Sequence, residues 1–165
     1  MPGTLNVGVI GCGNISSAYF RLSKLFQPIE VKACADLNVE IAQAQAEQFG
    51  LEALSVEDLI SHSELDIVVN LTVPNAHFAV SKAILEAGKH VYSEKPLTLS
   101  LEDGLALRDL AEQKGLRVAC TPDTFLGGTH QQARAMIDAG TLGEIVGGTC
   151  CLLYTSPSPR DLYRS

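Results

Sequence analysis

Residues 5–16, Leu-Asn-Val-Gly-Val-Ile-Gly-Cys-Gly-Asn-Ile-Ser, decide the fold of this 165-residue chain. A short apolar run at 5–10 predicts a buried strand, and a glycine-rich turn and a helical pattern follow it directly. Gly11 is expected to permit the tight turn, and Gly13 to let the backbone approach a phosphate group. Ser16 replaces the third glycine of the G-x-G-x-x-G pattern, but it is small enough for close packing of helix on strand. On its own, this pattern is a weak indicator of function.

Apolar strand-like runs alternate with amphipathic stretches along the rest of the chain. Strands are predicted at 5–10, 29–35, 67–71, 90–93 and 117–120, with the start of another at 145–149. Helices are predicted near 15–25, 39–49, 56–60, 76–87, 101–114 and 131–139. Nearly all-apolar strands that alternate with helices imply a parallel sheet covered on both faces. The predicted fold class is therefore α/β with a doubly wound parallel sheet, which binds ligands beyond the carboxyl ends of its strands.

Composition and charge exclude several classes of protein. The net charge of −7 leaves no broad basic surface for a nucleic acid. The longest apolar runs are far shorter than the roughly 20 residues that span a bilayer. Residues 1–6 lack the basic region of a signal peptide. A cytoplasmic protein without nucleic-acid or membrane partners is expected.

The five cysteines form an odd set without C-x-x-C spacing. They are Cys12, Cys34, Cys120, Cys150 and Cys151. Reduced and mostly buried thiols are expected, since several lie in or beside apolar strand-like runs. His62 and His90 show no metal-ligand spacing with a cysteine or an acid, so no metal site is predicted.

Asp36 strengthens the interpretation of the glycine-rich turn, because it ends the second predicted strand. In a Rossmann dinucleotide-binding fold, an acidic residue at this distance accepts hydrogen bonds from the ribose hydroxyls. The N–H groups of the turn and helix start, from Gly13 through Asn14 and Ile15, would hold the diphosphate. A carboxylate repels a 2′-phosphate, so NAD is favoured over NADP as cofactor. Two alternatives remain: a glycine-rich turn with Asp36 merely starting a helix, and a methyltransferase that uses S-adenosylmethionine.

Two further segments follow the third and fourth predicted strands. The third leads into Thr72, Val73, Pro74, Asn75, Ala76 and His77, and the fourth into Glu94-Lys95-Pro96. Together with the glycine-rich turn, these segments resemble the N-terminal domain of the glucose-fructose oxidoreductase, inositol dehydrogenase and MocA (Gfo/Idh/MocA) family. The resemblance covers about residues 5–149, and Glu94-Lys95-Pro96 is its most specific part.

The resemblance implies roles for individual residues. Lys95 would act at the reacting carbon, orient the substrate and favour the anionic form of a departing alkoxide, and its bond to Pro96 is a candidate for the cis form. Glu94 would help position the nicotinamide half of the cofactor. Thr72, Pro74, Asn75 and His77 would line the cofactor groove. Two of these roles have a plain alternative: Lys95 could be an ordinary surface lysine, and His77 a capping or packing residue.

The resemblance also implies how the chain is organised. It places a Rossmann domain at 1–125 and the beginning of a second α+β domain at 126–151. A non-native or disordered tail is expected at 152–165, because two prolines spaced by a serine prevent a regular element there and the string resembles translated vector sequence. Asp123, in the segment that leaves the first domain, could touch substrate or only shape the turn. In the family an Asp and a His on a helix of the second domain perform the acid/base work, and no residue here matches that motif.

The expected function is that of an NAD(P)-dependent oxidoreductase acting on the CH–OH group of a sugar, polyol or related small substrate. The chain would supply the nucleotide-binding half, and a full-length form could be an oligomer. The alternative is a non-catalytic dinucleotide-binding module.

Overall fold

The computed structural model describes residues 3–121 and 124–149, and the chain divides into two compact units between Pro122 and Asp123. The first unit contains a sheet and its helices, and the second contains one long helix. The residues predicted to form a tail, 152–165, lie outside the described residues, as do Asp123, Cys150 and Cys151. In the described residues, no helix is both long and apolar enough to cross a membrane.

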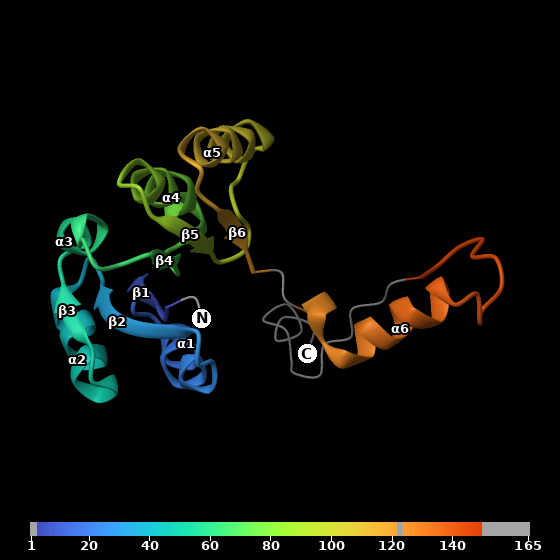
Figure 1. Ribbon diagram of the computed structural model, residues 1–165, viewed down its shortest axis with the longest axis horizontal. Helices are drawn as coiled ribbons and strands as arrows, with labels where there is room; N and C mark the ends of the chain where they lie inside the picture. The colour runs from blue at the N-terminus through green and yellow to red at the C-terminus, as the bar shows by residue number, and fades with distance from the viewer. Residues whose placement is uncertain (1–2, 122–123, 150–165) are drawn as a thin grey trace, which may run out of the picture. The chain divides into compact units, whose positions relative to one another are not determined.

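The first unit is built on a six-stranded sheet whose neighbouring strands are all parallel (Figure 1). Its strands are β1 (Leu5–Ile10), β2 (Ile29–Ala35), β3 (Glu52–Leu54), β4 (Ile67–Asn70), β5 (His90–Ser93) and β6 (Val118–Cys120). They lie in the order β3-β2-β1-β4-β5-β6, so the doubly wound parallel sheet is confirmed. The order reverses between β1 and β4, and ligands of such sheets bind beyond the carboxyl ends of the strands at this point.

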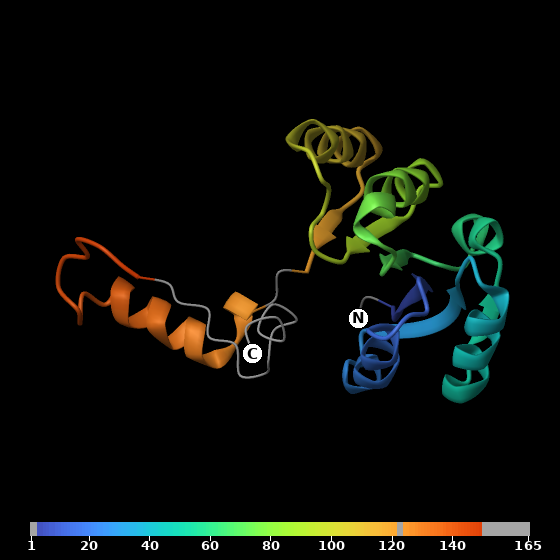
Figure 2. The ribbon, with the colours of Figure 1, turned by 180° about the vertical axis from the view of Figure 1, so that it is seen from behind.

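Helices cover both faces of the sheet, as the two opposite views show (Figures 1 and 2). They are α1 (Ser16–Leu22), α2 (Val39–Phe49), α3 (Val56–Ser61), α4 (His77–Glu86) and α5 (Leu101–Lys114), with short 3-10 turns η1 (Ser23–Leu25) and η2 (Pro74–Ala76). Buried side chains of α1 and α2 pack with one set of strand residues, and those of α3, α4 and α5 with the other. Two apolar layers therefore hold the strands in place from both sides.

Fully buried side chains form the larger layer, on the face covered by α3, α4 and α5. Leu59, Ile84 and Leu107 are completely buried there against strand residues such as Val68. Burial of such a side chain stabilises the fold by about 1.5–3 kcal/mol. On the other face, Phe20 packs on Phe49 with ring centroids 5.3 Å apart.

The cysteines of the described sheet are free thiols, as expected from the sequence. Cys12 and Cys34 are buried in the layer beneath α1 and α2, and Cys120 is half-buried. Burial makes these side chains small apolar packing groups.

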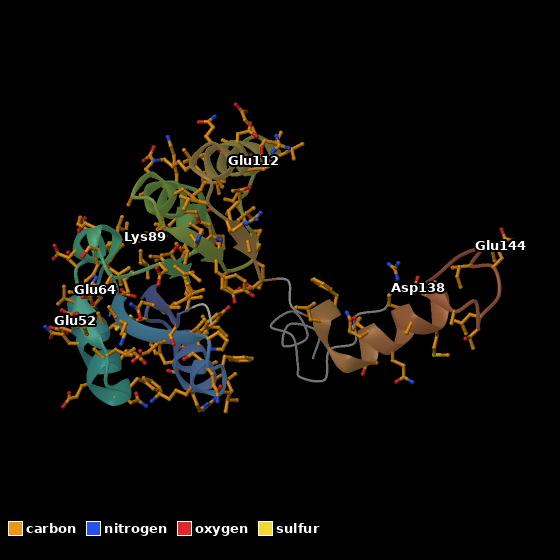
Figure 3. All side chains as sticks on the ribbon, in the orientation of Figure 1. Glu52, Glu64, Lys89, Glu112, Asp138 and Glu144 are labelled. Carbon is orange, nitrogen blue, oxygen red and sulfur yellow. The ribbon has the colours of Figure 1, made fainter. Side chains whose placement is uncertain are left out.

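A buried lysine joins two elements at the amino edge of the sheet (labelled in Figure 3). Lys89 precedes β5, and its Nζ donates to the carbonyl oxygens of His62 at 2.5 Å and Leu65 at 3.0 Å. Burial lowers the pKa of Lys89, and the charge of Asp66 opposes this shift. Because its amine is occupied at the edge opposite the strand carboxyl ends, Lys89 has a structural role.

Two strand predictions fail for the same reason. Strand β3 is absent from the prediction because it is only three residues long, partly exposed and paired with β2 alone. The strand expected at 145–149 is wrong, since none of these residues is in a strand. A strand exists only where a neighbouring strand accepts and donates its backbone hydrogen bonds. That neighbour is invisible in local apolar patterning, and none lies beside 145–149 among the described residues.

The second unit contains η3 (Thr124–Leu126) and α6 (Gly128–Asp138), the helix predicted at 131–139. Every side chain described from 125 to 149 is exposed. Arg134 and Asp138 form an ion pair of 2.7 Å on its surface. Exposed pairs contribute little, so α6 depends on local helix propensity within this unit.

Candidate cofactor site

The turn after β1 places Gly11 where no other residue fits. Its φ of +99° lies in the left-handed region, and a Cβ would stand 2.7 Å from the carbonyl carbon and oxygen of Leu71. Its N–H donates to the Ala35 carbonyl at 2.8 Å, which holds the turn to the end of β2. Gly11 therefore serves the fold by allowing three strand ends to meet closely.

Gly13 is surrounded by open space instead. A Cβ at this position would have no heavy atom within 4 Å, and the backbone is exposed. Within the described part of the chain, the N–H groups of Gly13, Asn14 and Ile15 donate to no acceptor. Buried Ser16 closes the turn below, as its Oγ donates to the Gly13 carbonyl at 2.6 Å. The turn thus presents three open backbone donors, which suit an anionic ligand.

The Asp36 carboxylate lies against this turn. Its Oδ2 accepts a hydrogen bond from the Cys12 N–H at 2.8 Å, and its Oδ1 accepts one from the Asn38 N–H at 2.9 Å. Each oxygen keeps a further lone pair that can accept from a ligand hydroxyl. Leu37, which follows, is 94% exposed and no basic side chain stands beside it in sequence. The Cys12 N–H is already used, so it is not a donor for an anion.

Asn70, at the end of β4, organises the neighbouring loop. Its Nδ2 donates to the His77 carbonyl at 3.1 Å and to Ser81 Oγ at 3.0 Å. Its Oδ1 accepts from the Thr72 N–H at 3.2 Å and from the Thr72 hydroxyl at 2.6 Å. The fully buried amide therefore fixes the path of the chain from β4 into α4.

His77 is buried within the first unit rather than exposed to a ligand. It is 1% exposed, and its Nδ1 and Nε2 lie 2.6 Å from the Pro96 carbonyl and 2.9 Å from the Thr72 carbonyl. The ring thereby joins the loop after β4 to the loop after β5. This geometry favours the packing alternative for His77, whereas Pro74 and Asn75 are exposed and Thr72 is half-buried.

The Glu94-Lys95-Pro96 segment follows β5. The Lys95–Pro96 peptide bond is cis, as the resemblance implied. The two carboxylate oxygens of Glu94 accept from the Lys95 N–H at 2.9 Å and from the Tyr19 hydroxyl at 3.2 Å. Lys95 is exposed, and its ammonium makes no hydrogen bond or ion pair with another described residue. The Lys95 ammonium is thus free to contact a ligand, while the hydrogen bonds of Glu94 to the Lys95 N–H and to Tyr19 hold the loop in place.

Backbone hydrogen bonds bring these loops to one edge of the sheet. The Leu71 N–H donates to the Ile10 carbonyl at 2.8 Å, and the Glu94 N–H to the Asn70 carbonyl at 2.8 Å. The turn after β1, the loop after β4 and the Glu94–Pro96 loop therefore lie side by side at the carboxyl ends of β1, β4 and β5. Asp36 joins them through Cys12.

The sequence prediction missed Tyr19 and Asn70 as parts of this site. Asn70 carried a usable signal, because an amide that ends the apolar run Ile67-Val68-Val69 requires buried partners. Tyr19 carried none, since its partner Glu94 lies 75 positions away in the sequence. Within the described residues, no group of three or more His, Cys, Asp or Glu side chains could hold a metal ion.

The sheet order and the loops at its carboxyl edge are those of a Rossmann-type nucleotide-binding domain. A family model described as "Oxidoreductase family, NAD-binding Rossmann fold" matches residues 5–121. The chain therefore belongs to the Gfo/Idh/MocA oxidoreductase family, as its motifs indicated.

Curated relatives agree with this assignment. The chain is 34% identical over 144 residues to dTDP-3,4-didehydro-2,6-dideoxy-alpha-D-glucose 3-reductase of Streptomyces violaceoruber, covering 86% of this chain and 42% of that protein. It is 31% identical over 143 residues to inositol 2-dehydrogenase/D-chiro-inositol 3-dehydrogenase of Lactiplantibacillus plantarum, covering 84% and 41%. The chain thus spans less than half the length of these relatives.

Solved structures share the fold. A 3-ketoreductase from Actinomadura kijaniata, bound to TDP-benzene and NADP, superposes with a TM-score of 0.81 at 30% identity over 87% of this chain and 45% of its own. A dehydrogenase from Bordetella pertussis, bound to NADH and UDP-GlcNAcA, has a TM-score of 0.80 at 26% identity over 87% and 42%. Biliverdin reductase from Synechocystis, bound to biliverdin and NADP+, has a TM-score of 0.74 at 30% identity over 85% and 44%.

Proposed function

We propose that this chain is the nucleotide-binding half of an NAD(P)-dependent oxidoreductase that acts on the CH–OH group of a sugar, a polyol or a related small substrate. The observation that carries the proposal is the Asp36 carboxylate held against a turn whose Gly13, Asn14 and Ile15 N–H groups are open. An acid beside open amides suits a ligand with ribose hydroxyls next to a diphosphate. Membership of an oxidoreductase family supports the same conclusion.

The residues present fit a nicotinamide dinucleotide. The open amides of the turn would hold the diphosphate, and the free space at Gly13 would admit it. Asp36 would accept hydrogen bonds from the adenosine ribose. NAD is the preferred cofactor in this proposal, since a carboxylate opposes a 2′-phosphate and no basic side chain adjoins it at Leu37 or Asn38. The related structures hold either NADH or NADP, so the preference rests on Asp36 alone.

Lys95 is the catalytic residue in this proposal. A bound nicotinamide would supply the hydride acceptor for the substrate carbon, and loss of the hydroxyl proton would place negative charge on the substrate oxygen. The ammonium of Lys95 would orient the substrate and stabilise that oxygen. Thr72, Pro74, Asn75, Glu94 and Pro96 would line or shape the nicotinamide side of the groove. The proton itself would go to an Asp or His of the second domain.

The substrate class follows from what several relatives act on. Their names include inositol dehydrogenases and a reductase of a dTDP-sugar, and one related structure holds UDP-GlcNAcA. Biliverdin reductase shows that the shared fold also serves a substrate of another kind. A hydroxylated small molecule is therefore the first class to test. The proposal also retains the predicted cytoplasmic location and the absence of nucleic-acid and membrane partners.

A titration of the 165-residue chain with NADH and NADPH tests cofactor binding. The fluorescence of the reduced nicotinamide reports binding, and NADH is expected to bind at least about tenfold more tightly than NADPH. Gly13→Val is the matched control, because a Cβ there has no protein heavy atom within 4 Å and the side chain is expected to obstruct the ligand rather than the fold. Its melting temperature should be retained while binding is lost. Equal NADH affinity in the variant would refute the proposed phosphate site.

The non-catalytic alternative is separated by turnover. The chain is mixed with NAD and with inositols, free sugars and sugar nucleotides in turn, and absorbance at the wavelength of NADH is followed. The same assay is repeated on a longer chain that continues into a second domain. Substrate-dependent NADH formation by that longer form supports the enzyme, and binding of NAD without turnover of any substrate supports the binding module.

A further inference from the structure

Tyr19 links helix α1 to the loop that carries Lys95. Its hydroxyl donates to Glu94 Oε1 at 3.2 Å, although the two residues are 75 positions apart. The other carboxylate oxygen, Oε2, accepts from the backbone N–H of Lys95 at 2.9 Å. The Glu94 carboxylate is therefore held on both oxygens and cannot turn freely.

The phenol is a stable donor in this position. Burial raises the pKa of Tyr19 to about 12, the contact with Thr121 opposes the rise, and the charge of Glu94 adds to it. At neutral pH the hydroxyl consequently keeps its proton. A hydrogen bond from a neutral donor to a carboxylate is among the stronger ones in proteins, since one partner carries charge.

Helix α1 connects this bond to the phosphate turn. The helix begins at Ser16, directly after the three open amides, and Tyr19 lies on its first turns. Phe20, its neighbour, is buried against the sheet and fixes the helix there. Tyr19 is thus a rigid connection between the end of the turn proposed to hold a diphosphate and the loop proposed to act on the nicotinamide.

We propose that Tyr19 is a positioning residue for the nicotinamide end of the cofactor, acting by fixing the Glu94 carboxylate and, through the Lys95 amide, the orientation of Lys95. This inference rests on the proposed function. It assigns no contact between Tyr19 and the cofactor. It predicts that the hydroxyl matters for a ligand that includes the nicotinamide and not for one that ends at the ribose diphosphate.

Tyr19→Phe tests the inference, because it removes one hydroxyl and keeps the packed ring. NADH and ADP-ribose are titrated separately against the unaltered chain and the variant. NADH affinity should fall roughly fivefold to tenfold, and ADP-ribose affinity should stay within about twofold. Glu94→Gln should lower NADH affinity by a similar factor, and the double variant should lose no more than either single one.

Ser17→Ala is the control on the same helix. Its hydroxyl donates to Gln45 at 3.3 Å, so its loss removes a hydrogen bond of α1 that does not reach Glu94. Both ligands should bind this variant normally. Melting temperatures of all variants are compared with that of the unaltered chain, and Glu94→Gln tests the same bond from its other side if Tyr19→Phe does not fold.

The outcomes separate the two proposals. Failure of ADP-ribose to bind the unaltered chain would overturn the proposed function itself. Normal ADP-ribose binding with unchanged NADH affinity in Tyr19→Phe would overturn only the role of Tyr19. An equal loss for both ligands would mean that the hydroxyl merely supports the fold, which also contradicts the inference.

Discussion

The two sides of the strand reversal build their loops in different ways. Beside β1 and β2, the chain offers backbone groups: a turn with open N–H groups and one carboxylate, Asp36, held by another N–H. Beside β4 and β5, buried side chains hold the loops: Asn70 fixes the loop after β4, and His77 joins that loop to the one after β5. A site that binds a ligand through backbone N–H groups needs glycine for close approach, and the glycines are visible in the sequence. The contacts of His77 with Pro96 and of Tyr19 with Glu94 join residues 19 and 75 positions apart, so only the folded structure reveals them.

The largest expected effect contrasts Gly11 with Gly13. Gly11→Ala forces a left-handed Cβ to within 2.7 Å of the Leu71 backbone and should lower the free energy of unfolding by more than about 3 kcal/mol. Gly13→Ala should change it by less than about 0.5 kcal/mol, because the added methyl meets nothing. Urea denaturation followed by circular dichroism measures both. Similar losses would show that the turn has one role rather than two.

The next largest effect on the free energy of unfolding is expected beside β4 and β5, where side chains hold the loops. Asn70→Ala removes the four hydrogen bonds of a buried amide. The Thr72 N–H and hydroxyl and the Ser81 hydroxyl then lose their partner, so the free energy of unfolding should fall by about 2–3 kcal/mol. The same denaturation assay applies. A cost below about 1 kcal/mol would mean that water replaces the amide and that the loop after β4 is not tied as described.

A smaller effect, on cofactor affinity, is expected from Asp36→Ala in the loops beside β1 and β2. NADH should bind roughly tenfold less tightly, and NADPH should lose little or improve, because the repulsion of a 2′-phosphate disappears. Isothermal calorimetry with both cofactors measures the ratio. Equal weakening of the two would remove Asp36 from its role in choosing the cofactor.

The smallest effect on folding and on dinucleotide binding is expected from Lys95→Met. The lysine is exposed and its ammonium has no partner among the described residues, so the unfolding free energy should change by less than about 0.5 kcal/mol. ADP-ribose should bind as before. Turnover by a form with both domains should nevertheless fall by orders of magnitude, measured as NADH formation. Retained turnover would return Lys95 to the class of ordinary surface lysines.

The outcome of the sequence predictions follows the same division. The parallel sheet and the helices around it were predictable, because both depend on local patterns of apolar residues. The cis bond before Pro96 followed from resemblance. Strand β3, the burial of His77 against the Pro96 carbonyl and the Tyr19–Glu94 hydrogen bond were not predictable, since each depends on a neighbour distant in the chain. The proposed roles of Lys95 and of the other site residues stay predictions.

The hydrogen bond between Asp36 and the Cys12 N–H has a practical consequence for changing which coenzyme the protein accepts. The same carboxylate that would choose the coenzyme also anchors the Gly11–Cys12 peptide of the turn. Any exchange of this acid that aims at a phosphorylated coenzyme therefore loosens the anchor. A redesign that succeeds needs a new oxygen acceptor for that peptide, such as a serine hydroxyl, together with a basic side chain in place of Leu37.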